Sequence, residues 1–410
     1  MKPRPSASPS IPALAFAACL GLAATYAVGK PPSGPPPVGT LSLDVWDDGA
    51  ERLHLLLGVS REGSSEPGLV HRVSEDGGES WSDPVAVGEG QAAPFAPHPG
   101  MDPQIAGRGG RLVAAWMVAG TGTFGSGPLA TAFSEDGGRT WQAGADPSDL
   151  GTTDGTGFMD LAADSEGIFH LVWLDSRDGR RGLRHAESSD GGRTWSPNAT
   201  VDPETCECCW NTLGLWDDGT PLVLYRAREP RDMAVSVRFG DGAEGTAAKW
   251  SPPAVVGGFG WQFEGCPHVG GGLALVETGK KRAVHAAVWT GREGAAGVYH
   301  VESNDGGLVW SEPHFLAGGL ANHPDIAAAD CGTLAAVWSE PDGDGRRIRA
   351  ARRGPDDRSW APASTLSKAG VAATHPRVVP ASGGFRVFWT EAGGEGKPQV
   401  WRSVPYPTEP

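Results

Sequence analysis

The sequence has no excess of basic residues and no long stretch with helical periodicity. It carries 34 Lys and Arg against 49 Asp and Glu, which gives a net charge of −15. Nucleic acids and anionic membranes both favour a basic surface, so neither is expected as a partner. No apolar pattern with a 3.6-residue period is visible, which argues against a helical fold. The 410 residues instead include 61 Gly, 35 Pro and 16 Trp, as suits many short strands joined by turns.

One eight-residue phrase, Ser-x-Asp-x-Gly-x-x-Trp, recurs four times, each time between two short runs of alternating apolar residues. The copies are residues 74–81 (SEDGGESW), 134–141 (SEDGGRTW), 188–195 (SSDGGRTW) and 303–310 (SNDGGLVW). The pattern predicts a tight hairpin turn, in which the Asp accepts hydrogen bonds and the Gly adopts a positive φ. The Trp is expected to cover the turn. The phrase resembles the Asp-box, or BNR repeat, of sialidase-like β-propellers.

This resemblance implies an all-β propeller, because repeats at near-fixed spacing are typical of such rings. Strand patterns divide the chain into seven units, although sialidases have six blades and six remains the alternative. The second strand of most units ends in an aromatic residue expected to pack between blades. These aromatic residues are Trp116, Trp173, Tyr225, Trp289, Trp338 and Trp389. The seventh unit lacks a fourth strand, and residues 37–43 are expected to supply it and close the ring.

The N-terminus has the pattern of an export signal. Lys2 and Arg4 precede an apolar run over residues 11–26, and Ala27 is the expected last residue removed. The domain prediction is a signal peptide over 1–27, a Pro-rich linker over 28–40 and a propeller over 41–405. The apolar run is too short for a transmembrane span. The mature protein is expected in the periplasm or outside the cell, with a lipid anchor at Cys19 as the alternative, and as a monomer.

Metal-ligand residue types accumulate where the first strand of each unit begins. In a propeller these positions share one face around the axis, opposite the Asp-box turns. Cys and His together favour a soft or borderline metal, and copper is favoured over zinc as the cofactor. The expected ligands are Cys206, Cys208, Cys209, Cys266 and His268, followed by His98, His323 and His375.

A structural interpretation of the cysteines competes with the metal site. Removal or lipidation of Cys19 leaves five cysteines, and an odd number cannot all pair within one chain. The Cys-x-Cys-Cys segment and Cys266 would then hold one or two disulfides between adjacent blades. His-Pro pairs would simply mark the starts of strands.

Sialidase activity is the second functional hypothesis. Sialidases bind the substrate carboxylate with three arginines and use a tyrosine nucleophile with an acid/base Asp, so the resemblance implies Tyr225 as nucleophile, Asp102 or Asp160 as acid/base, and Arg226 as a carboxylate ligand. The first arginine of such enzymes usually lies just before the first box region, and residues 41–46 (LSLDVW) contain none. Only four tyrosines are present, at 26, 225, 299 and 406.

The sequence therefore predicts an exported sialidase-like β-propeller with three possible functions. The first is a copper or zinc site near the axis, with a binding or redox role. The second is an exo-glycosidase that acts on a glycan or another small anionic ligand, for which paired arginines and acids offer bidentate contacts. The third is a non-catalytic recognition scaffold.

Overall fold

The computed structural model describes residues 37–49, 51–122, 125–150, 155–240, 249–393 and 397–408. All of them belong to one compact unit, 32–410. The signal peptide predicted over 1–27 and the lipid anchor at Cys19 lie outside the described residues. Nearly all regular structure is β-strand, and the helix in the described part of the chain is the short 3₁₀ turn η2 (Arg177–Gly179).

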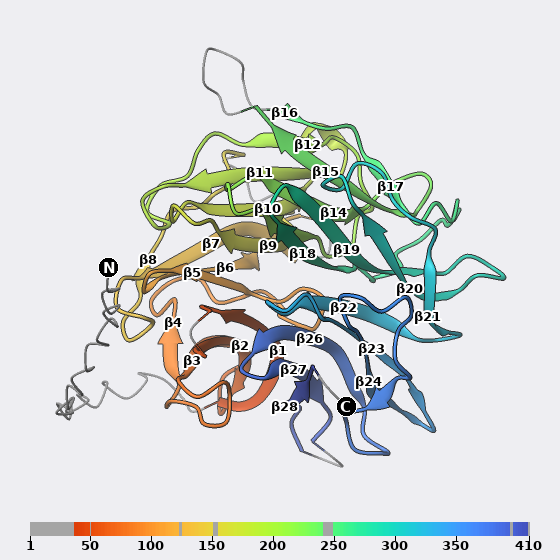
Figure 1. The fold of residues 1–410 in the computed structure, drawn as a ribbon. Helices are drawn as coiled ribbons and strands as arrows, with labels where there is room; N and C mark the ends of the chain where they lie inside the picture. The colour runs from red at the N-terminus through yellow and green to blue at the C-terminus, as the bar shows by residue number, and fades with distance from the viewer. Residues whose placement is uncertain are drawn as a thin grey trace, which may run out of the picture. The chain divides into compact units, whose positions relative to one another are not determined.

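The strands form seven antiparallel sheets, here called blades one to seven in chain order (Figure 1). Blade one contains β1 (Pro37–Asp47), β2 (Leu53–Arg61), β3 (Gly68–Ser74) and β4 (Val85–Val87). Blade two contains β5 (Gln104–Arg108), β6 (Arg111–Ala119), β7 (Ser126–Ser134) and β8 (Gln142–Ala143). Blade three contains β9 (Gly157–Ala163), β10 (Phe169–Asp175), β11 (Gly182–Ser188) and β12 (Ala199–Asp202). Blade four contains β13 (Thr212–Leu215), β14 (Pro221–Arg226), β15 (Met233–Phe239), β16 (Lys249–Trp250) and β17 (Ala254–Val256).

The remaining three blades complete the ring. Blade five contains β18 (Gly272–Thr278), β19 (Lys281–Thr290), β20 (Gly297–Ser303) and β21 (His314–Gly318). Blade six contains β22 (Asn322–Ala328), β23 (Leu334–Asp342), β24 (Gly345–Arg353) and β25 (Ser364–Thr365). Blade seven contains β26 (Ala373–Ala381), β27 (Gly384–Glu391) and β28 (Val400–Pro407). The innermost strands contact one another in the order β1, β5, β9, β13, β18, β22, β26 and back to β1, so the ring has seven blades.

The hydrophobic core lies between the blades. Seven clusters of buried apolar residues each join one blade to the next, including a cluster between blades seven and one. Alternating side chains of each strand point toward the two neighbouring blades, which is why both faces of each sheet are apolar. The aromatic residues predicted at the ends of second strands lie in these seams. Trp116, Trp173 and Trp338 are almost fully buried there.

The Asp-box turns have the predicted geometry. In the second box, Asp136 accepts hydrogen bonds from the Ser134 hydroxyl (2.8 Å) and from the Thr140 amide (2.9 Å) and hydroxyl (2.6 Å). The Ser134 hydroxyl oxygen in turn accepts from the Gly138 amide at 2.8 Å, and Trp141 donates its indole N–H to the Gly138 carbonyl at 3.2 Å. Gly138 has φ +86°, a value that an L side chain resists. The equivalent Asp in each other box accepts the corresponding hydrogen bond from the amide four residues later.

The expectation that residues 37–43 complete blade seven was wrong. Strand β1 pairs with β2 from Pro37 opposite Arg61 to Asp47 opposite Leu53, so residues 37–40 belong to blade one and not to a linker. Blade seven has three strands, as described. Packing closes the ring because Phe388 of β27 enters the core of blade one. The Thr40 amide also donates to the Gln399 carbonyl at 2.8 Å.

Candidate functional site

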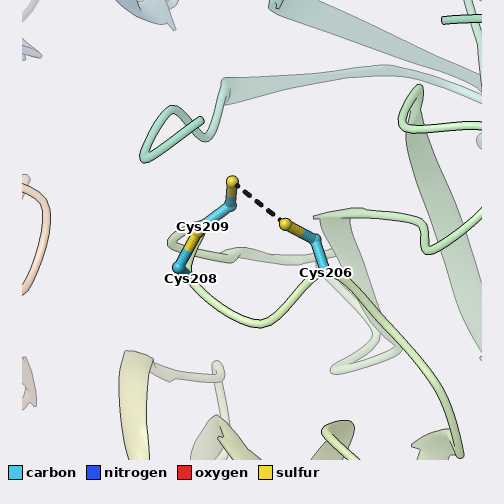
Figure 2. A group of neighbouring side chains, drawn as sticks. All are labelled: Cys206, Cys208 and Cys209. Atoms are coloured by element: carbon cyan, nitrogen blue, oxygen red, sulfur yellow. Dashed lines mark hydrogen bonds between the residues drawn. The ribbon is translucent and has the colours of Figure 1, made fainter. Parts of the chain in front are cut away.

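The Cys-rich loop connects β12 of blade three to β13 of blade four. The Cys206 amide donates to the Arg226 carbonyl at 2.9 Å, and the Thr205 amide donates to the Arg181 carbonyl at 2.8 Å, so both neighbouring blades fix the loop. Cys206, Cys208 and Cys209 are buried, and their three Sγ atoms lie within 4.8 Å of one another. Figure 2 shows the sulfurs of Cys206 and Cys209 facing each other, at 3.6 Å.

Positive charge surrounds the three thiols. Arg226 is 1% exposed, and its guanidinium donates to the main-chain carbonyls of Val269, Arg231 and Trp289. Arg231 is also buried, and its Nη1 has no hydrogen-bond partner in the described part of the chain. Main-chain carbonyls do not neutralise a guanidinium charge, so these groups favour an anion beside them.

The arrangement favours a thiolate at Cys206. Its contacts with the Cys208 and Cys209 thiols lower the pKa of Cys206, and Arg231 acts in the same direction. The pKa of Cys208 is raised by its thiol contacts, and that of Cys209 by burial. Thiolates rather than thiols bind metals, so a metal at this site would bind with loss of thiol protons.

Four histidines and a tryptophan lie at the same end of the axis. His98 and His268 are exposed, with ring centroids 6.4 Å apart. His323 and His375 are half-buried and stacked at 3.6 Å. The buried Trp210 contacts both stacked rings at 5.9 and 5.7 Å. Burial lowers the pKa of His268, and so does His98, while Cys206 opposes them, which places thiols and imidazoles within electrostatic reach.

Three of these histidines adopt an unusual backbone conformation. His268, His323 and His375 have φ values of 52°, 53° and 50°, and Phe158 at the corresponding position of blade three has 53°. A positive φ costs energy for a residue with a side chain, and such strain concentrates at functional sites. The same backbone conformation therefore recurs at the start of the innermost strand in four blades.

Below the mouth, four aspartates link the innermost strands of neighbouring blades. Each accepts a hydrogen bond from a backbone amide in the innermost strand of an adjacent blade. The pairs are Asp44 with Ile105 (2.8 Å), Asp102 with Leu43 (3.1 Å), Asp160 with Leu213 (2.6 Å) and Asp325 with Val378 (2.9 Å).

Arg377 balances part of this negative charge. Burial raises the pKa of Asp44 to about 7 and that of Asp160 to about 6, while Arg377 lowers both. Burial acts against the charge of Arg377, but the nearby aspartates raise its pKa. One Arg377 nitrogen lies 3.8 Å from Asp102 Oδ2. The aspartates therefore act as links between blades around a central arginine.

The residues expected for a glycosidase have structural contacts. Tyr225 is fully buried, and its hydroxyl donates to Asp202 at 2.8 Å and lies 3.1 Å from the Ser236 hydroxyl. Burial raises the pKa of Tyr225 above its ordinary value, which disfavours the phenolate. Arg226 donates to carbonyls, and Asp102 and Asp160 each hold a neighbouring strand. These contacts do not favour Tyr225 as a nucleophile, although its role as one stays untested.

Two features of the site were not anticipated. Cys266 is exposed and is not part of the three-thiol group. Trp210, directly after the Cys-rich segment, fills the space between Gly100, Gly270 and the stacked histidines. The close approach of Trp210 to two glycines is a tertiary contact, so only its position next to the cysteines could have indicated it.

Among the described residues, no helix is long and apolar enough to cross a membrane. Residues 43–242 match a family model described as a BNR repeat-like domain. No curated protein sequence matches the chain.

Solved structures of similar fold include three glycosidases or transglycosidases. A Hadza microbial sialidase is 18% identical over 84% of this chain and 74% of its own, with a TM-score of 0.45. A leech intramolecular trans-sialidase is 12% identical over 93% of this chain and 70% of its own, with a TM-score of 0.46. The GH93 α-L-arabinofuranosidase of Fusarium graminearum is 14% identical over 92% of this chain and 96% of its own, with a TM-score of 0.48. The BNR repeat-like match over residues 43–242, the four Asp-box turns and the seven sheets together support a sialidase-like β-propeller.

Proposed function

We propose that this propeller binds copper(I) at its axial mouth, through Cys206, Cys208 and Cys209. The observation that supports this most is the set of three buried thiols whose sulfur atoms lie within 4.8 Å of one another. Thiolates are soft ligands and favour copper(I) or zinc over harder ions. Arg226 and Arg231 would offset the negative charge of a metal bound by three thiolates.

Copper is favoured over zinc by the number of ligands. Structural zinc almost always takes four protein ligands, and the buried group supplies three. His268 would be the fourth ligand in the zinc alternative, since Cys206 lies within its electrostatic reach. His98 and His268 are exposed and His323 and His375 are half-buried, so an incoming ion would meet the first pair before the second.

Export belongs to the same proposal. The predicted signal over residues 1–27 would send the chain to the periplasm or outside the cell, where thiols tend to oxidise. A bound metal would protect Cys206 and Cys209, whose sulfurs are 3.6 Å apart. The competing outcome in that compartment is a disulfide between the same two residues.

Glycan hydrolysis remains the alternative function, on the similarity of fold. Fold alone does not fix activity. The buried, doubly hydrogen-bonded Tyr225 gives this alternative less support than the thiols give metal binding.

The test is metal analysis of protein isolated anaerobically from its exported fraction. We expect about one equivalent of copper per chain, and loss of that copper in Cys206→Ser, Cys208→Ser and Cys209→Ser. Cys331→Ser is the matched control, because Cys331 is exposed and outside the thiol group. Cys266→Ser tests separately whether Cys266, which lies outside the three-thiol group, contributes to copper binding. Protein without metal, with Cys206 and Cys209 joined in a disulfide, would refute the proposal.

A further inference from the structure

Three blades contain a pair of buried histidines on adjacent strands. The pairs join β2 to β3, β10 to β11 and β19 to β20, in blades one, three and five. The ring nitrogens Nδ1 and Nε2 of each pair lie 3.0 to 3.2 Å apart, in His54–His71, His170–His185 and His285–His300.

Each pair is covered by a tryptophan of the next blade. His71 packs against Trp141, His185 against Trp250 and His300 against Trp360, at centroid distances of 5.2 to 5.6 Å. The pairs are therefore repeated parts of the seams between blades.

Blades three and five add a carboxylate that blade one lacks. Glu187 lies opposite His170 in the strand register, and Glu302 lies opposite His285. The corresponding partner of His54 is Val73. Glu187 Oε1 is 3.5 Å from His170 Nδ1, and Glu302 Oε2 is 3.7 Å from His285 Nδ1.

We propose that His170, His185 and Glu187 bind a divalent metal of the zinc class, and that His285, His300 and Glu302 form a second such site. Within each group the three ligand atoms lie within 4.8 Å of one another. Two nitrogens bound to one tetrahedral zinc at 2.0–2.1 Å are about 3.3 Å apart, close to the 3.2 Å found in both pairs. Two imidazoles and a carboxylate are a ligand set that zinc takes in proteins.

The blade-three group also has a carboxylate behind one ligand. Asp164 Oδ2 lies 3.6 Å from His170 Nε2, the nitrogen on the far side of the ring. Ligating histidines commonly donate their other N–H to a carboxylate, which fixes the ring. His170 Nε2 is buried and makes no hydrogen bond in the described residues, so a small shift toward Asp164 on metal binding would satisfy it.

The local charge around each group is compatible with this assignment. Each glutamate already pairs with an arginine, Glu187 with Arg238 and Glu302 with Arg353. Both arginine side chains are partly exposed, so metal binding would release them to solvent at little cost.

The test separates these sites from the thiol site. The variant Cys206→Ser/Cys208→Ser/Cys209→Ser removes the proposed copper ligands and leaves the His-Glu groups intact. Calorimetric titration of this variant with zinc should give about two equivalents, and cobalt(II) should give the visible absorption bands of a tetrahedral site.

Single substitutions then show which group binds each zinc ion. Glu187→Gln and Glu302→Gln should each remove one equivalent, and the double variant should remove both. Asp164→Asn, a positioning change, should weaken zinc binding about tenfold. His54→Gln is the matched control, because its pair has no carboxylate, and it should leave the stoichiometry unchanged.

If the thiol-free variant does not fold, a second measurement on the unmodified chain tests the same sites. In the unmodified chain, zinc should raise the melting temperature, and the rise should shrink in Glu187→Gln/Glu302→Gln. Absence of zinc binding in folded thiol-free protein, or an equal zinc response with and without the glutamates, would overturn the proposal and leave the pairs as hydrogen-bonded seams.

Discussion

The His54–His71 pair makes the stability of the protein depend on pH, and its removal should weaken that dependence. Burial lowers the pKa of His54 to about 3 and that of His71 to about 4, and the positive charge of Arg52 adds to the effect on His54. In the unfolded chain both side chains titrate near 6.5. As the pH falls below 6.5 the unfolded state gains protons that the folded state refuses, so stability decreases until the pH reaches about 4.

The magnitude follows from the width of this pH window. One unit of pKa corresponds to about 1.4 kcal/mol, and pH 5 lies about 1.5 units below the unfolded pKa, so each histidine costs about 2 kcal/mol at pH 5. The two together cost about 4 kcal/mol if each takes up a proton on unfolding, against a typical total of about 5–15 kcal/mol. Asp44 and Asp160 act in the opposite direction, since burial raises the pKa of Asp44 to about 7 and that of Asp160 to about 6. Their effect is the same in the parent and the variant and cancels in the comparison.

The assay is urea unfolding of the parent and of His54→Gln/His71→Gln at pH 7 and pH 5, monitored by tryptophan fluorescence. The loss of unfolding free energy between the two pH values should be about 4 kcal/mol smaller in the variant, and at least about 2 kcal/mol smaller if the pair takes one proton. His314→Gln, which removes an exposed imidazole, should behave as the parent. An equal pH dependence in the parent and the double variant would refute the reasoning.

Two further substitutions test the turns and the closure of the ring. Asp136→Ala removes the acceptor of hydrogen bonds from Ser134 and Thr140 and should lower the free energy of unfolding by about 1–3 kcal/mol, measured in urea, whereas exposed Glu135→Ala should change it by less than about 0.5 kcal/mol. Arg386→Met removes hydrogen bonds across the seam, to the Gly77 carbonyl (2.8 Å) and Glu79 (2.9 Å), and should speed amide exchange in β1 and β28 more than in blades three and four. Uniform exchange rates in that variant would show that the seam does not limit opening.

The repeats of the sequence were sufficient to predict the fold because the features that define a blade are local. An Asp-box closes its turn through residues at most four positions apart, as Asp136 and Thr140 do, so its geometry follows from eight residues. Strand alternation is local as well, and the count of seven units is confirmed by the seven sheets. The meeting of Cys206, Cys208 and Cys209 also depends on a four-residue segment.

Several features that depend on contacts between blades were not predicted. The closure between blades one and seven joins Thr40 to Gln399, which are remote in the sequence. The sequence therefore did not indicate that the strand β1 belongs to blade one and not to blade seven. The histidine pairs form because the strand register places His170 diagonally across from His185, and no short motif marks that relation. Trp210 takes its position from glycines in two other blades, Gly100 and Gly270.

Repetition around the ring helps to separate structural groups from functional ones. The Asp-boxes, the second-strand aromatics and the aspartate links recur in several blades, and each holds a turn or joins neighbouring strands. The three-thiol loop occurs once in the described chain, between blades three and four. The positive charge of Arg226 acts on Cys209, and the described contacts of Arg226 are to main-chain carbonyls and not to a carboxylate. The other six seams between blades are stabilised by apolar residues, so stability alone does not require buried thiols and arginines at this position. The buried thiols and arginines would suit the proposed soft cation held by thiolates, in both their chemistry and their charge.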